Sequence, residues 1–270
     1  MPELPEVETI ARGLSRRVAG ETIDSVWLGE KPEPLKSSSE EILEVLSNKR
    51  ILGVRRVGKH IVFDLAQGRG RTPVAQWIVH LGMSGRMMAC TAEEAPVKHT
   101  HAIVKLGSGR ELRFVDPRRF GRLSVSRHFE AAGVEPLDVS LEIFISLFRG
   151  RKTPIKSALL NQKLLRGVGN IYADESLFRA GIRPKRRAAS LSRKELQKLY
   201  RAVQKVLKEA IALGGSSVSD YVDADGEEGF FQLRHRVYGR EGEPCLKCRT
   251  PVERLVIAGR SSHYCPNCQR

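Results

Sequence analysis

Hydrophobic residues near the start of the chain recur at the spacing of a helix. Val7, Ile10, Leu14 and Val18 lie three or four positions apart, with mostly polar residues between them. Residues at this spacing share one face of an α-helix. The pattern therefore predicts an amphipathic helix over residues 5–18.

Short apolar runs dominate the next part of the chain, from residue 22 to about residue 126. Runs of this length, bounded by turn residues, are typical of β-strands. The glycines at 58 and at 107–109 indicate hairpin turns, and a short helix over 40–46 interrupts the series. We expect a β-sandwich with flanking helices, with strands over 51–57, 60–65, 74–80, 102–106, 112–115 and 123–125.

The pattern returns to helical spacing after residues 131–136, which contain Gly133 and Pro136 and predict a linker. The longest predicted helix carries apolar residues on one face along its whole length. A segment rich in glycine and serine, 215–226, follows it. The predicted helices cover residues 141–148, 155–160, 171–179 and 193–213.

Four of the five cysteines form two C-x2-C pairs with sixteen residues between the pairs, namely Cys245 with Cys248 and Cys265 with Cys268. Four thiolates at this spacing suit one tetrahedral zinc ion, and four protein ligands make the site structural. Residues 255–264 predict two short strands around a Gly-Arg turn, as in a β-hairpin finger. Two disulfides in a secreted protein are the alternative. They are disfavoured because no signal peptide precedes the chain and Cys90 is left over.

The charge balance points to a polyanionic partner. Lys and Arg number 46 against 31 Asp and Glu, which gives a formal net charge of +15. Such an excess favours nucleic acid, although a basic protein without nucleic acid remains an alternative at this point. The chain contains no run of eighteen apolar residues, so we expect no membrane span and a cytoplasmic protein.

The first residues offer candidate chemistry. Pro2 is small, so an aminopeptidase could remove Met1 and leave a secondary amine at the terminus. An α-amino group has a pKa near ~8, which leaves a usable neutral fraction at neutral pH. Glu3 places a carboxyl group one residue away as a proton donor or acceptor. Many chains begin with Met-Pro without any such chemistry, and this alternative stays open on these residues alone.

Gly167-Val168-Gly169-Asn170 stands just before a predicted helix. Two glycines let the backbone approach a ligand closely, and a helix start offers N–H groups to an anion. Asn170 could cap the helix or donate its amide to an anion. The motif is also compatible with an ordinary turn and cap. It is no dinucleotide fingerprint, because no strand precedes it and the third glycine is missing.

Taken together, these motifs make the chain resemble the bacterial formamidopyrimidine-DNA glycosylases. The resemblance covers essentially the whole chain in family order, through residues 2–9, 80–85, 116–121, 167–173, 237–240 and the four cysteines. It implies an α+β multidomain fold. The expected domains are a catalytic β-sandwich over 1–133, a helix-two-turn-helix domain over 134–235 and a zinc finger over 236–270.

The resemblance also implies base excision with strand cleavage on double-stranded DNA that contains oxidised purines, namely 8-oxoguanine and formamidopyrimidines. Pro2 would attack the sugar C1′ and form a Schiff base, with Glu3 as the acid/base. Lys59 would serve β-elimination as proton donor or phosphate contact, and Arg260 would serve δ-elimination and bind phosphate. Apart from the resemblance, Lys59 and Arg260 would be taken for ordinary exposed side chains.

The damaged base must leave the duplex before it can react. The resemblance assigns Met83, Arg118 and Phe120 to the space that the base vacates, with Arg118 bonding the orphaned cytosine. Without the resemblance, Met83 and Phe120 would be taken for core residues. His99, Arg151 and Asn170 are the other expected DNA contacts, in addition to Arg118.

Segment 215–226 corresponds to a loop that closes over the everted lesion, with Ser217 and Tyr221 near the lesion pocket. Glu6 would line the same site, or would simply belong to the first turn of its helix. Endonuclease VIII relatives usually carry Gly where this chain has Leu4, which favours the purine branch. A zinc-ribbon DNA-binding protein without catalysis is the competing class. We expect a monomer associated with the bacterial nucleoid.

Overall fold

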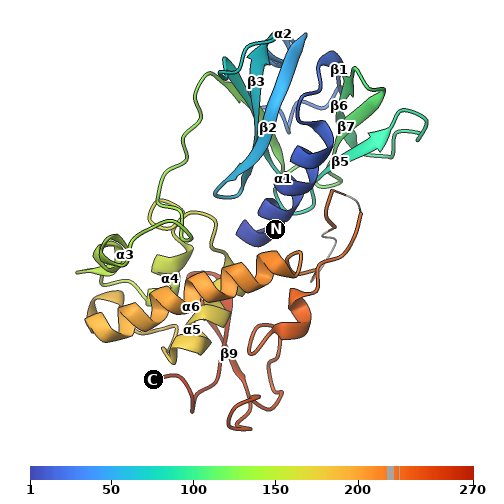
Figure 1. The fold of residues 1–270 in the computed structure, drawn as a ribbon. Helices are drawn as coiled ribbons and strands as arrows, with labels where there is room; N and C mark the ends of the chain where they lie inside the picture. Colours follow the sequence, from blue (N-terminus) through green and yellow to red (C-terminus); the bar gives the residue numbers. More distant parts are fainter. Residues whose placement is uncertain (218–221, 225) are drawn as a thin grey trace. The chain divides into compact units, whose positions relative to one another are not determined.

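The computed structural model describes residues 1–217, 222–224 and 226–270 (Figure 1). The chain forms two compact units. The amino-terminal unit comprises residues 1–130 and 214–229, and the carboxyl-terminal unit comprises residues 131–213 and 230–270. The segment after the long helix of the second unit therefore belongs to the first unit.

The amino-terminal unit contains two four-stranded antiparallel sheets, which confirms the predicted β-sandwich. The first sheet has the order β2-β3-β4-β8, and the second has the order β1-β6-β7-β5. The strands are β1 (Ile23–Leu28), β2 (Lys49–Val57), β3 (His60–Gln67), β4 (Ala75–His80), β5 (Arg86–Thr91), β6 (Thr100–Leu106), β7 (Arg110–Val115) and β8 (Arg122–Ser126).

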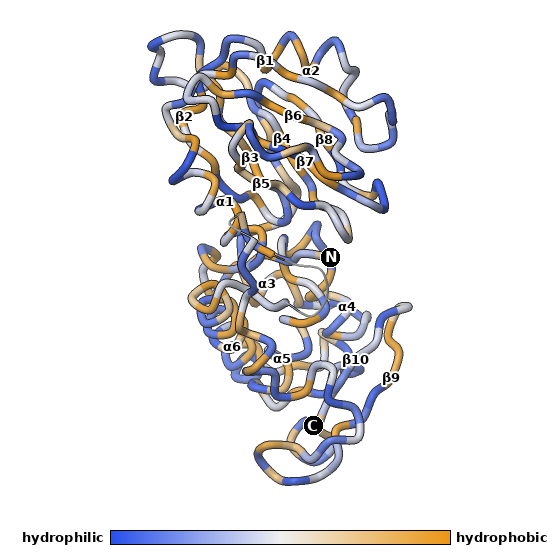
Figure 2. The backbone as a smooth tube through the Cα atoms, turned by 90° about the vertical axis from the view of Figure 1, so that its right-hand side faces the viewer, coloured by the Kyte–Doolittle hydropathy of each residue, from blue (hydrophilic) through white to orange (hydrophobic). Residues whose placement is uncertain are grey.

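The core of this unit joins both sheets to α1 (Leu4–Val18). Phe63 and Trp77 of the first sheet, and Phe114 of the second, belong to the same buried cluster as Leu14 of α1. Hydrophobic segments accordingly follow the strands in Figure 2. The short helix α2 (Ser39–Leu46) adds Ile42 to this core. The predicted first helix is confirmed, and it begins one residue earlier than expected.

Strands β1 and β5 were not predicted. Both lie at the edges of the second sheet. Each buries only one of its six residues fully. Edge strands with so little buried surface lack the apolar runs by which strands are recognised in a sequence.

The carboxyl-terminal unit is helical, with a terminal hairpin of two strands. The bounds of α3 and α4 match the prediction, and α6 ends one residue earlier than expected. The elements of the carboxyl-terminal unit are α3 (Leu141–Phe148), α4 (Ile155–Leu160), α5 (Asn170–Ala180), η1 (Ala188–Ser190), α6 (Arg193–Ala212), η2 (Phe231–Arg234), β9 (Glu253–Ile257) and β10 (Arg260–Tyr264).

Of the two roles considered for Asn170, capping of the helix is wrong. The helix begins at Asn170 itself, the cap position belongs to Gly169, and no side chain caps this end. The Asn170 side-chain amide instead donates to Ser261 Oγ at 3.4 Å. It therefore links the start of α5 to the terminal hairpin.

Buried charges attach that hairpin to α4 and α5. Lys156 Nζ lies 2.7 Å from Asp174 Oδ1, and both side chains are 0% exposed. Asp174 also accepts the backbone N–H of His263 at 2.9 Å. The neighbouring Glu175 accepts three consecutive backbone N–H groups, those of residues 236–238. Burial raises the pKa of Glu175, while these backbone bonds act in the opposite direction.

No helix within the described residues is both long and apolar enough to cross a membrane.

Replacing Lys156 by Met should destabilise the carboxyl-terminal unit, because it leaves the Asp174 carboxylate buried without its cation. Removing one partner of a buried pair costs about 3–5 kcal/mol. Urea unfolding, followed together with zinc release, would measure this loss. Lys152→Met, at an exposed lysine four residues earlier, is the matched control and should change stability little. Equal effects of the two substitutions would contradict the role of the buried pair.

Candidate functional site

The first turn of α1 fixes the residues at the amino terminus. Glu3 and Glu6 are 5% and 2% exposed. Glu6 Oε2 accepts the backbone N–H of Glu3 at 2.8 Å, and the Glu3 side chain accepts the backbone N–H of Glu6 in return. This capping box satisfies two backbone donors that the helix leaves open. Pro2, directly before it, is thereby held at the end of a rigid element.

The other carboxylate oxygen of Glu6 holds a distant segment. Glu6 Oε1 accepts the backbone N–H of Ser216 at 2.8 Å. Gly215 has a φ of +87°, and a Cβ there would lie 2.8 Å from Glu6 Oε1. Only glycine fits at this position. Ser217 Oγ accepts the backbone N–H of Gly229 at 2.9 Å, and this bond joins the two positions between which residues 218–228 run. The predicted pocket residue Tyr221 lies outside the described residues.

Cationic groups face the terminal amine. Partial burial lowers the pKa of the Met1 amino group below its usual value of 8.0. Glu3 raises this pKa, Lys59 lowers it, Glu6 raises it and Arg118 lowers it, in decreasing order of effect. Lys59 is only 7% exposed, so it is not the ordinary exposed lysine of a hairpin turn. Carboxylates and cations from α1 and from two loops thus surround one amine.

Two large apolar side chains near this amine face solvent. Met83 is 47% exposed and Phe120 is 52% exposed, so neither is a core residue. The Arg118 guanidinium carbon lies 4.9 Å from the centroid of the Phe120 ring. A cavity of about 320 Å³ is lined by Met1, Met83 and Phe120 among other residues. The three residues predicted to fill the space of the everted base, here called the wedge residues, thus comprise an arginine stacked on an aromatic ring and an exposed methionine.

The loops that carry these side chains, residues 81–85 and 116–121, touch each other. Gly82 has a φ of +62°, and a Cβ there would lie 2.5 Å from the Phe120 carbonyl carbon. His80 Nδ1 accepts the Gly82 N–H at 3.1 Å. Burial, followed by the charges of His60, Lys59 and Arg122, lowers the pKa of His80 to about 4. The ring is therefore neutral at pH 7 and can act as this acceptor.

Asp116 joins the two loops and was not singled out from the sequence. Its side chain is fully buried. Oδ1 accepts the Ser84 hydroxyl at 2.6 Å and the Arg118 N–H at 3.2 Å, and Oδ2 accepts the Gly121 N–H at 2.7 Å. One carboxylate thus fixes the backbone on both sides of Phe120 and the residue after Met83. The only sequence signal is an acidic residue before Pro117 at a turn.

In the carboxyl-terminal unit, Asn170 and Arg260 lie near one hairpin turn. Arg260 is exposed and begins β10, directly after Gly259. Asn170 bonds to Ser261, the residue after Arg260. The remaining predicted DNA contacts, Arg151 of this unit and His99 of the amino-terminal unit, are both exposed. His99 adopts a φ of +69°, and its carbonyl accepts the Asp116 N–H at 3.0 Å.

The four predicted ligand cysteines converge. All four sulfur atoms lie within 4.8 Å of one another. The Sγ–Sγ distances are 3.4 Å for Cys248 with Cys265 and 4.0 Å for Cys245 with Cys268. Tetrahedral zinc with bonds of about 2.3 Å separates its sulfur ligands by about 3.8 Å, between these values. The cysteines fit one structural zinc ion. Cys90 lies apart from them, half-buried on β5.

Comparison with known proteins agrees with this arrangement. Residues 1–123 match the formamidopyrimidine-DNA glycosylase N-terminal domain, and residues 132–222 match the formamidopyrimidine-DNA glycosylase H2TH domain. Residues 242–270 match a zinc finger found in FPG and IleRS. The chain belongs to the formamidopyrimidine-DNA glycosylase family. The predicted fold class and the zinc site are thereby confirmed.

Individual relatives cover the whole length. A formamidopyrimidine-DNA glycosylase of Solibacter usitatus is 45% identical over 100% of both chains. The crystal structure of the Thermus thermophilus MutM (Fpg) protein is 44% identical, covers 99% of this chain and 98% of its own, and has a TM-score of 0.87. A Lactococcus lactis FPG mutant in complex with Fapy-dG-containing DNA is 32% identical over 100% of both chains, with a TM-score of 0.90.

Replacing Asp116 by Asn should impair excision from duplex DNA. In either orientation the amide nitrogen faces a backbone N–H, of Arg118 or of Gly121, and an unsatisfied buried group costs about 1–3 kcal/mol. We expect the single-turnover rate on a lesion duplex to fall about tenfold to hundredfold. Strand cleavage at an abasic site in single-stranded DNA should stay within about twofold, because no stacked duplex needs a wedge.

Asp64→Asn is the matched control, since Asp64 on β3 bonds Arg55 and Gln76 instead of the loops. It should leave both rates unchanged. A parallel loss of both activities in Asp116→Asn would show that Asp116 has a general structural role instead of positioning the wedge.

Proposed function

We propose that this family member is a bifunctional DNA glycosylase and AP lyase that removes 8-oxoguanine and formamidopyrimidines from duplex DNA. The observation that carries the proposal is the terminal amine, which lies among Glu3, Glu6, Lys59 and Arg118. This is the amino group of Met1, and removal of Met1 would leave the Pro2 amine beside the same carboxylates and cations, a setting that a binding protein does not need. The Lactococcus lactis relative bound to Fapy-dG DNA supports the substrate class.

The chemistry begins once Met1 has been removed. The neutral Pro2 nitrogen attacks C1′ of the damaged nucleotide, and the base leaves with the bonding electron pair and accepts a proton. The nitrogen loses its own proton, the C1′–O4′ bond breaks as O4′ takes the electron pair and a proton, and the opened sugar is left as an iminium, the Schiff base. Glu3 is the group placed to move protons at this site, because it directly follows Pro2 and is almost fully buried.

Strand cleavage follows from the iminium, which acidifies the neighbouring C2′ proton. Loss of that proton expels the 3′ phosphate, and a second elimination expels the 5′ phosphate. Lys59 has the larger effect of the two cations that lower the pKa of the Met1 amine, Lys59 and Arg118, and we assign it to the first elimination. Arg260 serves the second elimination and binds phosphate. Zinc supplies no chemistry here but holds the hairpin that carries Arg260.

Recognition uses the wedge and the exposed cations. Met83 and Phe120 enter the stack where the damaged base leaves it, and Arg118 bonds the orphaned cytosine. His99, Arg151 and Asn170 contact the DNA backbone. Ser217 and Tyr221 belong to the segment that covers the lesion. The Ser217 hydroxyl accepts the backbone N–H of Gly229.

The domain boundaries that we propose are 1–133, 134–235 and 236–270. The change from strands to helices after β8 and the cysteine cluster at the end support these boundaries, although residues 214–229 pack with the amino-terminal unit. We also propose that the protein acts as a monomer in the bacterial nucleoid. The excess of basic residues, 46 against 31 acidic residues, favours such a location.

Sodium borohydride should link this protein covalently to a duplex that contains 8-oxoguanine, because it reduces the Schiff base to a stable amine. Mass spectrometry of the adduct should place DNA on Pro2, in chains that have lost Met1. Chains that retain Met1 should form no adduct. A fully active preparation that retains Met1 would refute the mechanism, and intact DNA affinity without any adduct would favour a binding protein.

Replacing Lys59 by Gln should move the pH dependence of adduct formation. The amine must be neutral to attack, so its pKa sets the acidic limb of the rate profile. Lys59 lowers the pKa of the Met1 amino group, and we expect it to act in the same direction on the Pro2 amine that becomes the terminus. Its removal therefore raises that pKa and shifts the acidic limb to higher pH.

Lys59→Arg keeps the charge and should keep the limb in place, even if the rate at the plateau falls. The initial rate of trapping by sodium cyanoborohydride, which survives at pH 5, would be measured between pH 5 and pH 9 and would report the limb separately from the later elimination. An unchanged limb in Lys59→Gln would contradict the electrostatic role of Lys59.

A further inference from the structure

One face of α6 carries a continuous row of cations. Its members are four and three positions apart in alternation, a spacing that keeps them on one side of a helix. At a rise of about 1.5 Å per residue the row is about 21 Å long. We call it the α6 stripe, and it consists of Lys194, Lys198, Arg201, Lys205 and Lys208, all exposed.

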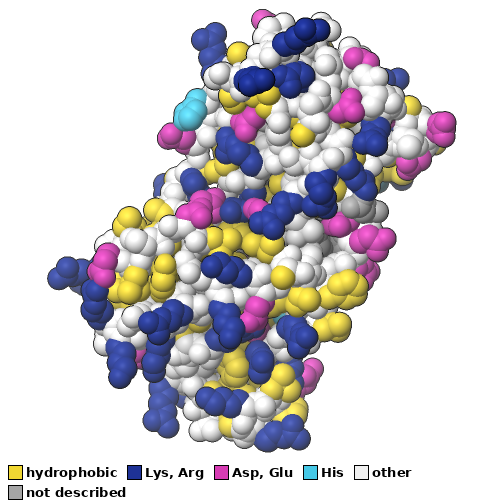
Figure 3. All heavy atoms as spheres, viewed as in Figure 1, with side chains coloured by type: hydrophobic (Ala, Val, Ile, Leu, Met, Phe, Trp, Pro, Cys, Tyr) yellow, Lys and Arg dark blue, Asp and Glu magenta, His cyan; other side chains and the backbone are white. Residues whose placement is uncertain are grey.

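The charges of the α6 stripe are not neutralised by neighbours. Within the part of the chain that the structure describes, none of its members has a carboxylate partner within ion-pair distance. The two carboxylates of α6 are engaged elsewhere, because Glu195 pairs with Arg186 and Glu209 pairs with Arg179. Lys and Arg side chains are crowded on this face of the unit (Figure 3).

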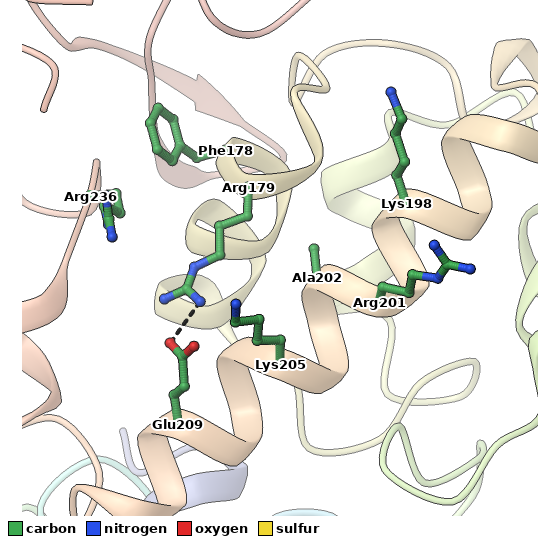
Figure 4. A pocket seen from close by; sticks show the side chains of 8 residues that line it. All are labelled: Phe178, Arg179, Lys198, Arg201, Ala202, Lys205, Glu209 and Arg236. Atoms are coloured by element: carbon green, nitrogen blue, oxygen red, sulfur yellow. Dashed lines mark hydrogen bonds and ion pairs between the residues drawn. The ribbon is translucent and has the colours of Figure 1, made fainter. Parts of the chain in front are cut away.

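A groove of about 530 Å³ runs beside the stripe (Figure 4). Its walls come from α5, from α6 and from the segment after η2. Five cations and one carboxylate face it, and the carboxylate is the one paired with Arg179. The lining residues are Phe178, Arg179, Lys198, Arg201, Ala202, Lys205, Glu209 and Arg236.

The groove is separate from the proposed lesion-binding contacts of the same unit. Asn170 and the hairpin turn lie at the start of α5, whereas Phe178 and Arg179 lie near its end. Nine residues of helix separate Asn170 from Arg179, or about 14 Å. None of the residues that line the groove is among those proposed to contact the lesion-bearing segment.

We propose that the α6 stripe and its groove bind the phosphate backbone of a second DNA segment while the lesion site holds the first. The proposal rests on the proposed function. A stripe of about 21 Å spans about six base-pair steps of duplex DNA, at ~3.4 Å per step. Exposed lysines and arginines without partners release condensed counterions when they meet phosphates.

An acidic protein segment fits the groove less well. Binding energy in protein–protein interfaces is concentrated in a few residues, most often Trp, Tyr and Arg, that lie in well-packed, desolvated pockets. Phe178, the aromatic residue of the groove, is only 9% exposed, and Ala202 is 8% exposed. A surface made of charge without anchors suits a uniform polyanion. Binding of a second segment allows the protein to pass between DNA molecules without first becoming free.

The test compares two double variants of the full-length protein. Lys198→Glu/Lys205→Glu alters the groove, and Arg69→Glu/Arg71→Glu alters two exposed arginines in the β3–β4 loop of the other unit. Each reverses two positive charges, which lowers the formal net charge from +15 to +11. All four positions are exposed, and zinc content and unfolding would verify that both variants are folded.

The measurement is dissociation from a labelled duplex that carries a stable abasic analogue, at increasing concentrations of unlabelled undamaged duplex. Direct transfer makes the dissociation rate rise with competitor concentration. We expect this rise in the native protein and in the Arg69/Arg71 variant. In the Lys198/Lys205 variant its slope should fall about tenfold, because phosphate contacts are lost. Single-turnover excision from a short lesion duplex should stay within about twofold in all three proteins.

An unchanged slope in the Lys198/Lys205 variant would overturn the proposal, and so would an equal loss of slope in both variants, which would reflect net charge alone. Binding of a polyglutamate peptide that is lost in the groove variant, with transfer intact, would assign the groove to an acidic protein. Failure of borohydride trapping would instead overturn the proposed function, so the two failures are distinguishable.

Discussion

The Glu6 carboxylate is the interaction on which the arrangement of the catalytic end depends. One oxygen accepts the Glu3 N–H and the other accepts the Ser216 N–H. A carboxylate that is 2% exposed is tolerated only when such donors satisfy it. The same group therefore fixes the backbone of the first residues and the backbone of Ser216, which lies 210 positions away. Gly215 follows from this contact, since any side chain would displace the carboxylate.

Asp116 has a comparable role in the loops that carry Met83 and Phe120. Leaving Met83 and Phe120 in water forgoes the stabilisation of about 1.5–3 kcal/mol that burial of each would bring. Their loops cannot rely on that burial for order. They are held instead by backbone bonds to a buried carboxylate and to a neutral histidine. Buried or half-buried polar side chains thus hold the backbone of two loops whose apolar side chains are exposed.

The sequence predicted the features that repeat locally. Helices α3 and α4 follow from apolar spacing, and the zinc site follows from two cysteine pairs. It could not predict the burial of Lys59, because a Gly-Lys turn is usually exposed and its burial depends on tertiary contacts. The side-chain partner of Asn170 could not be predicted either, since Ser261 lies 91 positions away in the sequence. The edge strands β1 and β5 were missed because they bury too little to show a pattern.

The cysteine cluster links the protein to the oxidants that create its proposed substrates. Cys245 and Cys265 are buried, but Cys248 and Cys268 are only partly covered. Peroxide that oxidises an accessible thiolate to a sulfenic acid removes a metal ligand. The hairpin that carries Arg260 then loses its brace, although the amine at the other end of the chain is untouched. Oxidative stress severe enough to reach these sulfurs would impair lesion removal when lesions are most frequent.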